Sequence, residues 1–573
     1  MKRLAVFLLL LLPGSALSLD RSAFTFNKYE LNVRIEPGQQ RLAVRGSITL
    51  RNDSIMPQKN LVLQISSSLS WVAIQLHGSP LQFASQLYTT DMDHTGALSE
   101  AIVSLPQPVA PKQAIELEIG YEGVIAQDTT RLARIGVPIE KARHSDWDRI
   151  SRSFTAVRGI GYVAWYPVAT QAVEMAQASE FWSEIGGWKR REAAAAMDVN
   201  LCLAGSRKED IAIMNDAPAA TREAGVKTDH APLDCAKHSF PKLGDTVPII
   251  AVGNYASAQK SGVALYYLAD DQSGLETYGL ALDQGMDLVK KLFGERSSAD
   301  GMRTIDLDDS EAEPFQSATT LLVPFRAKDS VLLLSTVQQM TEGLFSSAQS
   351  WVRDGLARYA QFELLEERSS PAEMKMYLEG QSDALRGFES EHAKSGNGGQ
   401  HNSLPDSLDA SYIEAKAASV WWMLKDIVGE NQLRSALSKY NPTDDTGPTY
   451  VRKLIESEAH RDLAWFFDDW VYHDRGLPDL RIDSVYPRQL PGGGYMVTVT
   501  VENLGSAGAE VPVTLRMEPG EEKQRLIVAA KSKASVRIQT AAMPVEATVN
   551  DGSVPETDRN NNRYKTQAPA SSQ

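Results

Sequence analysis

The chain has 573 residues, of which 43% are hydrophobic and 23% charged, with a formal net charge of −15. Its charges of both signs are spread without long blocks, which argues against nucleic acid or an anionic membrane as a partner. Once a leader is set aside, about 555 residues remain, which is long enough for three or four domains.

Residues 1–18 have the features of a secretory signal peptide. Lys2 and Arg3 precede an apolar run from Leu4 to Leu12, and a small-residue cleavage site follows near Ala16. That run is too short to span a bilayer, and no later stretch reaches about twenty apolar residues. The sequence therefore predicts export to the periplasm or cell exterior, with no integral membrane segment.

The chain has two cysteines, Cys202 and Cys235. Export would permit a disulfide between them. Two free buried cysteines fit the sequence equally well, so both interpretations stay open.

Residues 19–253 are predicted to form an antiparallel β-sandwich. Tyr29, Leu31, Val33 and Ile35 alternate with polar residues, as a strand with one buried face requires. The alternation resumes after a turn at 36–39 and again in further short runs.

Residues 254–390 change to a mixed pattern of strands and helices. A strand at Val263–Leu268 precedes a helix at Gly274–Phe293 that ends at Gly294, and strands follow at Arg303–Leu307 and Thr319–Val323. Residues 391–480 are predicted to be largely helical after a polar linker, with the clearest helix at Leu408–Val428. The predicted fold class is thus multidomain α+β.

Two amphipathic helices stand at the centre of the chain, within residues 330–367. The buried face of the first is predicted from Leu333, Val337, Met340 and Leu344. That of the second is predicted from the following residues: Trp351, Gly355, Tyr359 and Phe362.

The second helix begins W-V-R-D-G-L-A at 351–357. This layout resembles the active-site helix pair of the M1 aminopeptidases, gluzincin metallopeptidases with HExxH on the first helix and W-x-x-E-G-x-A on the second. The resemblance implies a β-saddle domain over 19–253, a thermolysin-like domain over 254–390 and its helical continuation over 391–480. It also implies a zinc ion held by two histidines and a glutamate.

The residues that would hold the zinc are replaced in this chain. The best register places Ser335, Thr336 and Gln339 on the motif positions, and a second register uses Val331 and Ser335. Neither contains a histidine. Asp354 occupies the third-ligand position, and its alternative role is an i,i+4 pair with Arg358 on a solvated face. No cofactor is expected, and zinc only if an atypical site survives.

Two other family positions depart from the pattern or stay ambiguous. The stretch 314–321 lacks the glutamate that in the family binds the substrate's amino terminus. Tyr412 lies where the family has a tyrosine that stabilises the oxyanion. The alternative for Tyr412 is a buried aromatic with a satisfied hydroxyl.

Residues 481–573 are predicted to form an immunoglobulin-like β-sandwich, because short alternating strands are separated by Gly, Asn and Asp turns. The turn patterns resemble the CARDB-type modules of exported bacterial proteins. Asp551, Glu556 and Asp558 could hold Ca²⁺ or could simply form turns.

The function predicted is that of an exported M1-like protein that has lost zinc and catalysis and keeps a peptide-binding or scaffolding role. A residual metallo-aminopeptidase with an atypical zinc site is the alternative. A third possibility is that the helix pair is ordinary packing unrelated to the family. The sequence contains no G-x-S-x-G elbow, P-loop or CxxC motif.

Overall fold

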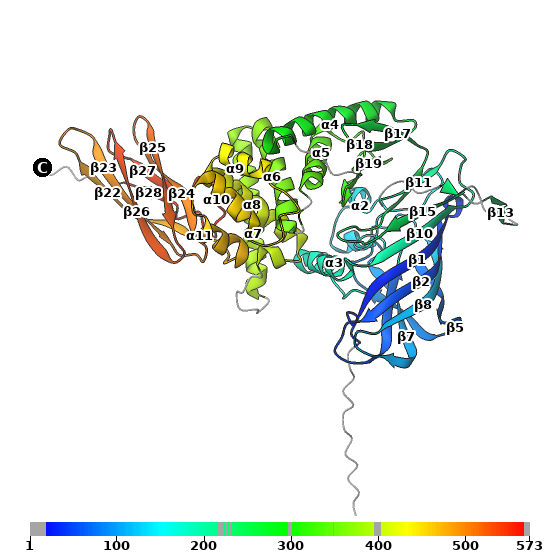
Figure 1. Ribbon diagram of the computed structural model, residues 1–573. Coiled ribbons are helices and arrows are strands. Elements are labelled where there is room, and N and C mark those ends of the chain that lie inside the picture. The colour runs from blue at the N-terminus through cyan, green and yellow to red at the C-terminus, as the bar shows by residue number, and fades with distance from the viewer. Residues whose placement is uncertain are drawn as a thin grey trace, which may run out of the picture.

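A computed structural model describes most of the chain, and its described residues are 19–215, 222–223, 227–228, 231–232, 234–295, 301–345, 347, 349–394 and 403–566. The predicted signal peptide at 1–18 lies outside them. Figure 1 shows a β-rich N-terminal part at the lower right, a helical part in the middle and a C-terminal β-module at the left. The predicted mixed α+β architecture is confirmed.

The N-terminal part is built on an eight-stranded sheet. Its order is β12-β15-β10-β1-β2-β8-β4-β5, with these bounds: β1 Phe24–Glu36, β2 Arg41–Asn52, β4 Leu69–Leu76, β5 Ser79–Pro80, β8 Ala114–Val124, β10 Ala196–Leu203, β12 Arg222–Glu223 and β15 Asp234–Phe240. The alternating residues Tyr29, Leu31, Val33 and Ile35 are all buried, as predicted. Their side chains share a core with a second sheet of order β3-β7-β6, formed by Gln58–Ser66, Ala97–Val109 and Gln82–Thr89.

One pair in the large sheet is not antiparallel as predicted: β1 and β10 run parallel. A parallel pair needs a long connection, and residues 37–195, which include β2 to β8, supply it. The last part of this connection, residues 125–195, contains α1 (Thr130–Arg134), α2 (Ile139–Ser145), β9 (Phe154–Val157) and α3 (Ala178–Glu192).

The remaining strands and helices of this part are short, and one disulfide links two strands of the large sheet. β9 joins β11 (Ile211–Met214) and β16 (Ile250–Gly253) in a three-stranded sheet, β13 (Lys227–Thr228) pairs with β14 (Ala231–Pro232), and η1 spans Pro37–Gln39. Cys202 of β10 and Cys235 of β15 lie opposite each other and form a disulfide. Of the two open interpretations, the structure therefore has the bonded one.

A five-stranded sheet of order β17-β18-β19-β21-β20 follows, with bounds Tyr255–Lys260, Val263–Leu268, Arg303–Asp306, Thr320–Val323 and Phe315–Ser317. The predicted long helix is α4, Gln272–Phe293; the Asp271 side chain accepts from the Gly274 amide, 2.8 Å away, and Gly294 ends the helix. Next come α5 (Asp329–Leu344) and α6 (Ser350–Arg368). The residues predicted to form the buried faces of these two helices are all buried, except Leu344, which is half-buried.

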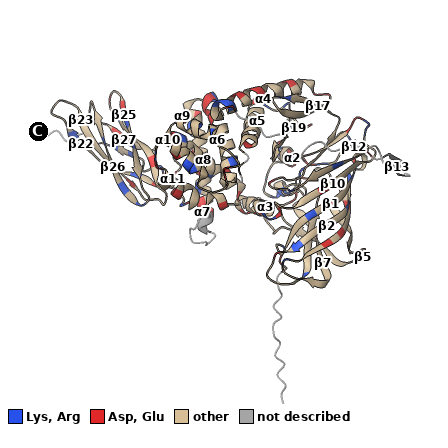
Figure 2. Ribbon diagram, viewed as in Figure 1, with Lys and Arg blue, Asp and Glu red and all other residues tan. Residues whose placement is uncertain are grey.

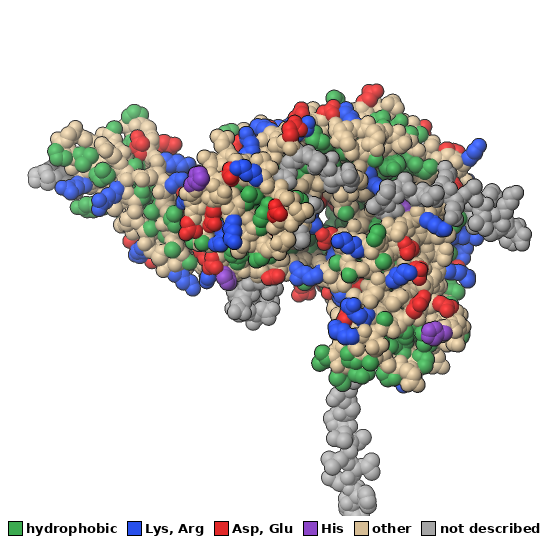
Figure 3. Space-filling view, in the orientation of Figure 1, with side chains coloured by type: hydrophobic (Ala, Val, Ile, Leu, Met, Phe, Trp, Pro, Cys, Tyr) green, Lys and Arg blue, Asp and Glu red, His purple; other side chains and the backbone are tan. Residues whose placement is uncertain are grey.

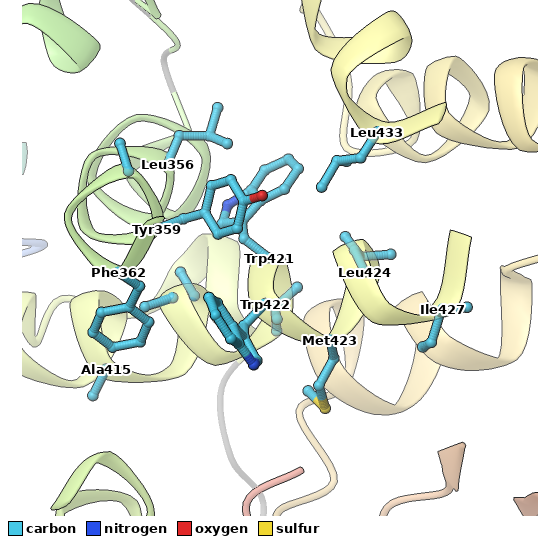
Figure 4. Packing of buried hydrophobic residues seen from close by; sticks show 14 of the residues in the cluster. Leu356, Tyr359, Phe362, Ala415, Trp421, Trp422, Met423, Leu424, Ile427 and Leu433 are labelled. Carbon is cyan, nitrogen blue, oxygen red and sulfur yellow. The ribbon is translucent and has the colours of Figure 1, made fainter. Parts of the chain in front are cut away.

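The helical part packs α6 against α8. Its elements are α7 (Pro371–Lys394), η2 (Leu404–Asp406), α8 (Ala410–Val428), α9 (Glu430–Ser438), α10 (Tyr450–Ala459), α11 (Ala464–Phe467) and the π-helical turn η3 (Asp468–Tyr472). Trp351 and Trp421 stack with ring centroids 5.4 Å apart. Figure 4 shows the neighbouring side chains of α6 and α8 filling the space between these helices. Within the described residues, no helix has both the length and the apolar character needed to cross a membrane.

The contact between α6 and α8 depends on a glycine. A Cβ atom at Gly355 would lie 2.5 Å from the Ala417 Cβ and 3.0 Å from the Trp421 Nε1. We expect Gly355→Ala to lower the free energy of unfolding by about 1–3 kcal/mol, because the extra atom overpacks the contact. Gly380→Ala in α7 meets no atom within 4 Å. It should instead raise stability by about 0.5–1 kcal/mol, and denaturant titrations of the two variants test this difference in sign.

The C-terminal module consists of two antiparallel sheets that face each other across a shared core. One has the order β22-β23-β26 (Leu480–Gln489, Tyr495–Asn503, Ser532–Thr540), and the other has the order β25-β24-β27-β28 (Glu521–Val528, Ala509–Arg516, Glu546–Val549, Arg563–Lys565). It is joined to the helical part by the Trp470 Nε1, which donates to the Gly508 carbonyl at 2.9 Å, and by the pair Arg461–Glu510.

Charged side chains of both signs are distributed over the ribbon (Figure 2), and they alternate on the visible face of the surface (Figure 3). No large patch of a single sign is visible on that face. This agrees with the even charge distribution of the sequence.

Candidate functional site

The residues assigned to the degenerate zinc motif face the interior of the protein. Gln339 is fully buried, its Nε2 donates to the carbonyls of Arg303 (2.7 Å) and Thr319 (3.1 Å), and its Oε1 accepts from Thr304. Thr336 is also fully buried and faces α4, where a Cβ at Gly285 would lie 2.9 Å from its Cγ2. Ser335 is 8% exposed. The predicted convergence of Gln339 on Asp354 is therefore wrong, because Gln339 is bonded to the sheet.

A different stripe of α5 faces α6. Val331, Leu334, Gln338 and Glu342 are its half-buried residues. The Gln361 Nε2 of α6 donates to the Leu334 carbonyl at 3.0 Å and to the Gln338 Oε1 at 3.3 Å. Gln338 and Glu342 share a face of α5 one turn apart, and Gln338 contacts the second helix directly.

Glu342 is the end of a chain of hydrogen bonds that connects three elements. Its carboxylate accepts from the Gln316 Nε2 of the edge strand β20 at 2.7 Å and from the Gln338 Nε2 at 3.1 Å. Gln338 accepts in turn from Gln361, and the Gln361 Oε1 accepts from the Arg358 Nη1 at 2.7 Å. We call this sequence of contacts the amide chain.

Asp354 is held by its neighbour and not by Arg358. The Arg353 Nε lies 2.7 Å from the Asp354 Oδ1, and the Arg353 Nη1 lies 2.5 Å from the Asp245 Oδ2. Arg358 donates to Gln361 instead, so the predicted pair between Asp354 and Arg358 is wrong. One guanidinium thus binds two carboxylates from distant parts of the chain.

These residues belong to a larger charged cluster, which we define as Lys189, Asp245, Glu342, Arg353, Asp354 and Glu414. Burial, followed by the negative charge of Asp354, raises the pKa of Glu342 to about 8 and that of Glu414 to about 7. Burial lowers the pKa of Lys189, and the negative charges of Asp245 and Asp354 partly offset this decrease. At neutral pH the cluster therefore contains a largely protonated carboxyl group among fixed charges.

Four segments bring the cluster together: α3, the loop after β15, the α5–α6 pair and α8. The approach of α3 depends on Gly186, where a Cβ would lie 2.1 Å from the Leu408 carbonyl oxygen. The Arg190 Nη2 of α3 also donates to the Asp406 carbonyl at 3.2 Å. Sequence reasoning missed Lys189, although Phe181, Ile185 and Trp188 have helical spacing and could have revealed α3.

The cluster does not fit the zinc ion that the M1 resemblance implies. Among the described residues, no three His, Cys, Asp or Glu side chains are grouped so that they could hold one metal ion. Arg353 binds the carboxylate at the third-ligand position, and Gln338 and Glu342, which face α6 from α5, are bonded to each other. A guanidinium cation in hydrogen-bond contact with that carboxylate repels a second cation.

Tyr412 is bonded through its hydroxyl to a residue outside the charged cluster. The hydroxyl donates to Asp474, and the Lys416 Nζ lies 2.7 Å from the Asp474 Oδ1, with both charged side chains fully buried. Burial and the Asp474 carboxylate raise the pKa of Tyr412 well above its ordinary value. Of the two interpretations, the structure has the buried aromatic with a satisfied hydroxyl.

The three acidic residues considered for Ca²⁺ have separate partners. Asp551 pairs with the Lys523 Nζ at 2.9 Å, and Asp558 accepts from the Asn560 amide at 2.9 Å. Glu556 is fully buried and accepts from the Asn550 Nδ2 at 2.7 Å and the Leu480 amide at 3.3 Å. They stabilise turns of the C-terminal module.

Comparisons with known proteins give structural likeness only. No family model matches the chain, and neither does any curated protein. Among solved structures, the chain is similar to the M1 zinc metallopeptidase from Deinococcus radiodurans, with a TM-score of 0.47 and 14% identity over 80% of this chain and 96% of that one. A mutant of the same enzyme bound to a Tyr-Ser-Ala substrate gives a TM-score of 0.45 at 14% identity, with the same coverage of both chains.

Proposed function

We propose that the protein is an exported, non-catalytic relative of the M1 metallopeptidases that binds peptide segments at its charged cluster. The observation that carries this proposal is Arg353, whose guanidinium binds Asp354 at the third-ligand position and bridges to Asp245. With Gln338 and Glu342 facing α6 from α5, the helix pair offers hydrogen-bonding groups in place of a metal site.

Peptide binding is supported by the position of the edge strand β20. In the sheet order β20 is terminal and pairs with β21, and its Gln316 contacts Glu342 of the cluster. An extended peptide can add to such an edge through its backbone, while neighbouring charged side chains bind its polar groups. The mixed signs of Lys189, Arg353 and Glu414 suit a ligand with amide groups and both termini.

Export is supported by two independent features. The residues at 1–18 have the charge and apolar pattern of a signal peptide. The Cys202–Cys235 disulfide is of the kind that persists in oxidising compartments. We assign the β-module after residue 480 as an immunoglobulin-like, CARDB-type adhesion module, and we keep the division at residues 253, 390 and 480.

The proposal is tested by metal content and peptide binding of the purified full chain. We expect well under one zinc per chain by elemental analysis and no turnover of aminoacyl-arylamides above a boiled control. Labelled random peptides should bind in fluorescence polarisation, and Arg353→Gln should weaken that binding while the distant surface variant Arg563→Gln leaves it unchanged. Stoichiometric zinc that survives dialysis, with turnover, would establish the residual peptidase instead.

A designed metal site tests which face of α5 opposes Asp354. The variant Gln338→His/Glu342→His/Arg353→Gln puts two imidazoles on one face and frees the Asp354 carboxylate. We expect it to bind zinc with a Kd on the order of 1 μM or weaker, because no residues have been built to orient the imidazoles. The matched variant Ser335→His/Gln339→His/Arg353→Gln should bind none. Calorimetric titration with zinc distinguishes them, and the reverse result would restore the register predicted from the sequence.

A further inference from the structure

A cavity of about 650 Å³ lies where the helical part meets the C-terminal module, away from the charged cluster. The C-terminal ends of α6 and α8, the first turns of α7 and the loop at 551–553 surround it. Its apolar lining comes from Pro371, Met374, Leu378 and Trp422. Sites of this size at the junction of two structural units are typical of small-ligand binding.

Trp422 supplies a hydrogen-bond donor to this cavity. Its side chain is 8% exposed, and its indole nitrogen, which has no acceptor among the described residues, is not sealed from solvent. Figure 4 shows this nitrogen on the side of the ring away from Phe362. Because this N–H is open to solvent and Trp422 lines the cavity, a ligand there can replace water as its acceptor.

The charged residues around the cavity are each neutralised by a partner in the protein. Lys425 lies 2.6 Å from Glu366, Asp426 lies 2.5 Å from Arg525, and Asp551 lies 2.9 Å from Lys523. Glu430 pairs with Arg434, and Lys375 lies 3.9 Å from Glu379. The rim therefore offers many hydrogen-bonding atoms without an uncompensated charge that would select an ion.

We propose that this cavity binds a neutral, polyhydroxylated ligand, namely a short sugar chain. A sugar hydroxyl accepts from the Trp422 N–H and can donate to the carboxylates of Glu366 or Asp426, while its C–H face packs on Met374 and Leu378. An ionic ligand would have to break existing ion pairs to gain its own. This site is separate from the charged cluster and from the peptide binding proposed for it.

The test is a titration of the full chain with neutral disaccharides: maltose, cellobiose, lactose and N,N′-diacetylchitobiose. Saturation-transfer NMR should detect at least one of them with a Kd on the order of 1 mM or tighter. Trp422→Phe removes the N–H and keeps the ring, so it should weaken that binding about three- to tenfold. Trp182→Phe, a half-buried tryptophan of α3, is the matched control and should have no effect.

Ser369→Phe provides a second variant, because it places a ring in the cavity and should abolish sugar binding. The proposal is overturned if none of the disaccharides binds, or if binding is unchanged in both Trp422→Phe and Ser369→Phe. It is also overturned if trilysine or triglutamate competes for the cavity in a Trp422-dependent way, since that would assign it to a charged peptide.

Discussion

Replacing Asp474 by alanine is expected to lower the free energy of unfolding by about 3–5 kcal/mol, because it leaves Lys416 as an uncompensated buried charge. Both side chains are fully buried, and the ammonium also donates to the Gly476 carbonyl at 3.1 Å. The measurement is a urea titration followed by tryptophan fluorescence, since Lys416 lies 4.6 Å from the centre of the Trp470 ring.

Two further variants distinguish the contribution of the ion pair to stability from that of the neighbouring hydrogen bond. Tyr412→Phe removes one hydrogen bond and leaves the pair, so it should cost only about 1.5–3 kcal/mol. Lys416→Met/Asp474→Asn keeps an acceptor for the Tyr412 hydroxyl and removes both charges. It should be more stable than Asp474→Ala. If the double variant is instead the least stable, the pair stabilises the fold more than its desolvation costs.

Glu342 is expected to make the folded protein less stable as the pH rises from about 4.5 to 8. Its pKa in the folded state, about 8, is above the ordinary value of 4.5, so between these values the folded state binds more protons than the unfolded state. Glu342→Gln removes this ionisation and keeps the size of the side chain. We expect a gain on the order of 2 kcal/mol at pH 9 and little change at pH 4.

Thermal unfolding at pH 4, 7 and 9 checks this prediction. Glu276→Gln, at an exposed position of α4, is the control and should follow the wild type at every pH. Some pH dependence should remain in Glu342→Gln, because burial also raises the pKa of Asp306 to about 7. A variant that loses stability equally at all three pH values would show that Glu342 acts through its hydrogen bonds and not through its proton.

Elements that consist of an apolar run between clear end signals could be predicted from the sequence. The strand at Val263–Leu268 has the predicted bounds, and the helices at Gln272–Phe293 and Ala410–Val428 differ from the prediction by two residues at one end. Each of the two helices is a run rich in apolar residues with a capping residue at one end, Asp271 at the start of the first and Gly429 at the end of the second.

The face of α5 that opposes α6 could not be predicted in the same way. The helix is buried on most of its circumference, and the polar residues Ser335, Thr336 and Gln339 are among its buried residues. A polar residue in this helix therefore does not identify the face that is directed away from the core. Gln339 looks polar in the sequence, yet its partners are backbone carbonyls of a sheet. Which amide is inside depends on those carbonyls, and local sequence does not encode their position.

The charged cluster could not be predicted because its members are far apart in the chain. Lys189 and Glu414 are separated by the whole central sheet and both helices of the α5–α6 pair. The close packing of Gly186 on the Leu408 carbonyl, together with the bond from Arg190 to the Asp406 carbonyl, brings α3 to the start of α8. The parallel pairing of β1 with β10 has the same origin, since it depends on a long connection and not on either strand.

The amide chain has a direction. Every link donates toward Glu342: Arg358 to Gln361, Gln361 to Gln338, and Gln338 to the carboxylate. Aligned hydrogen bonds polarise one another, so the charge on Glu342 and the donor strength of Arg358 are linked through two amides. Arg358 is exposed, whereas Glu342 is half-buried. A ligand that takes a proton from Glu342 would make this carboxylate a stronger acceptor and would strengthen each bond of the amide chain. The guanidinium protons of Arg358, at the outer surface of α6, would then exchange more slowly with water.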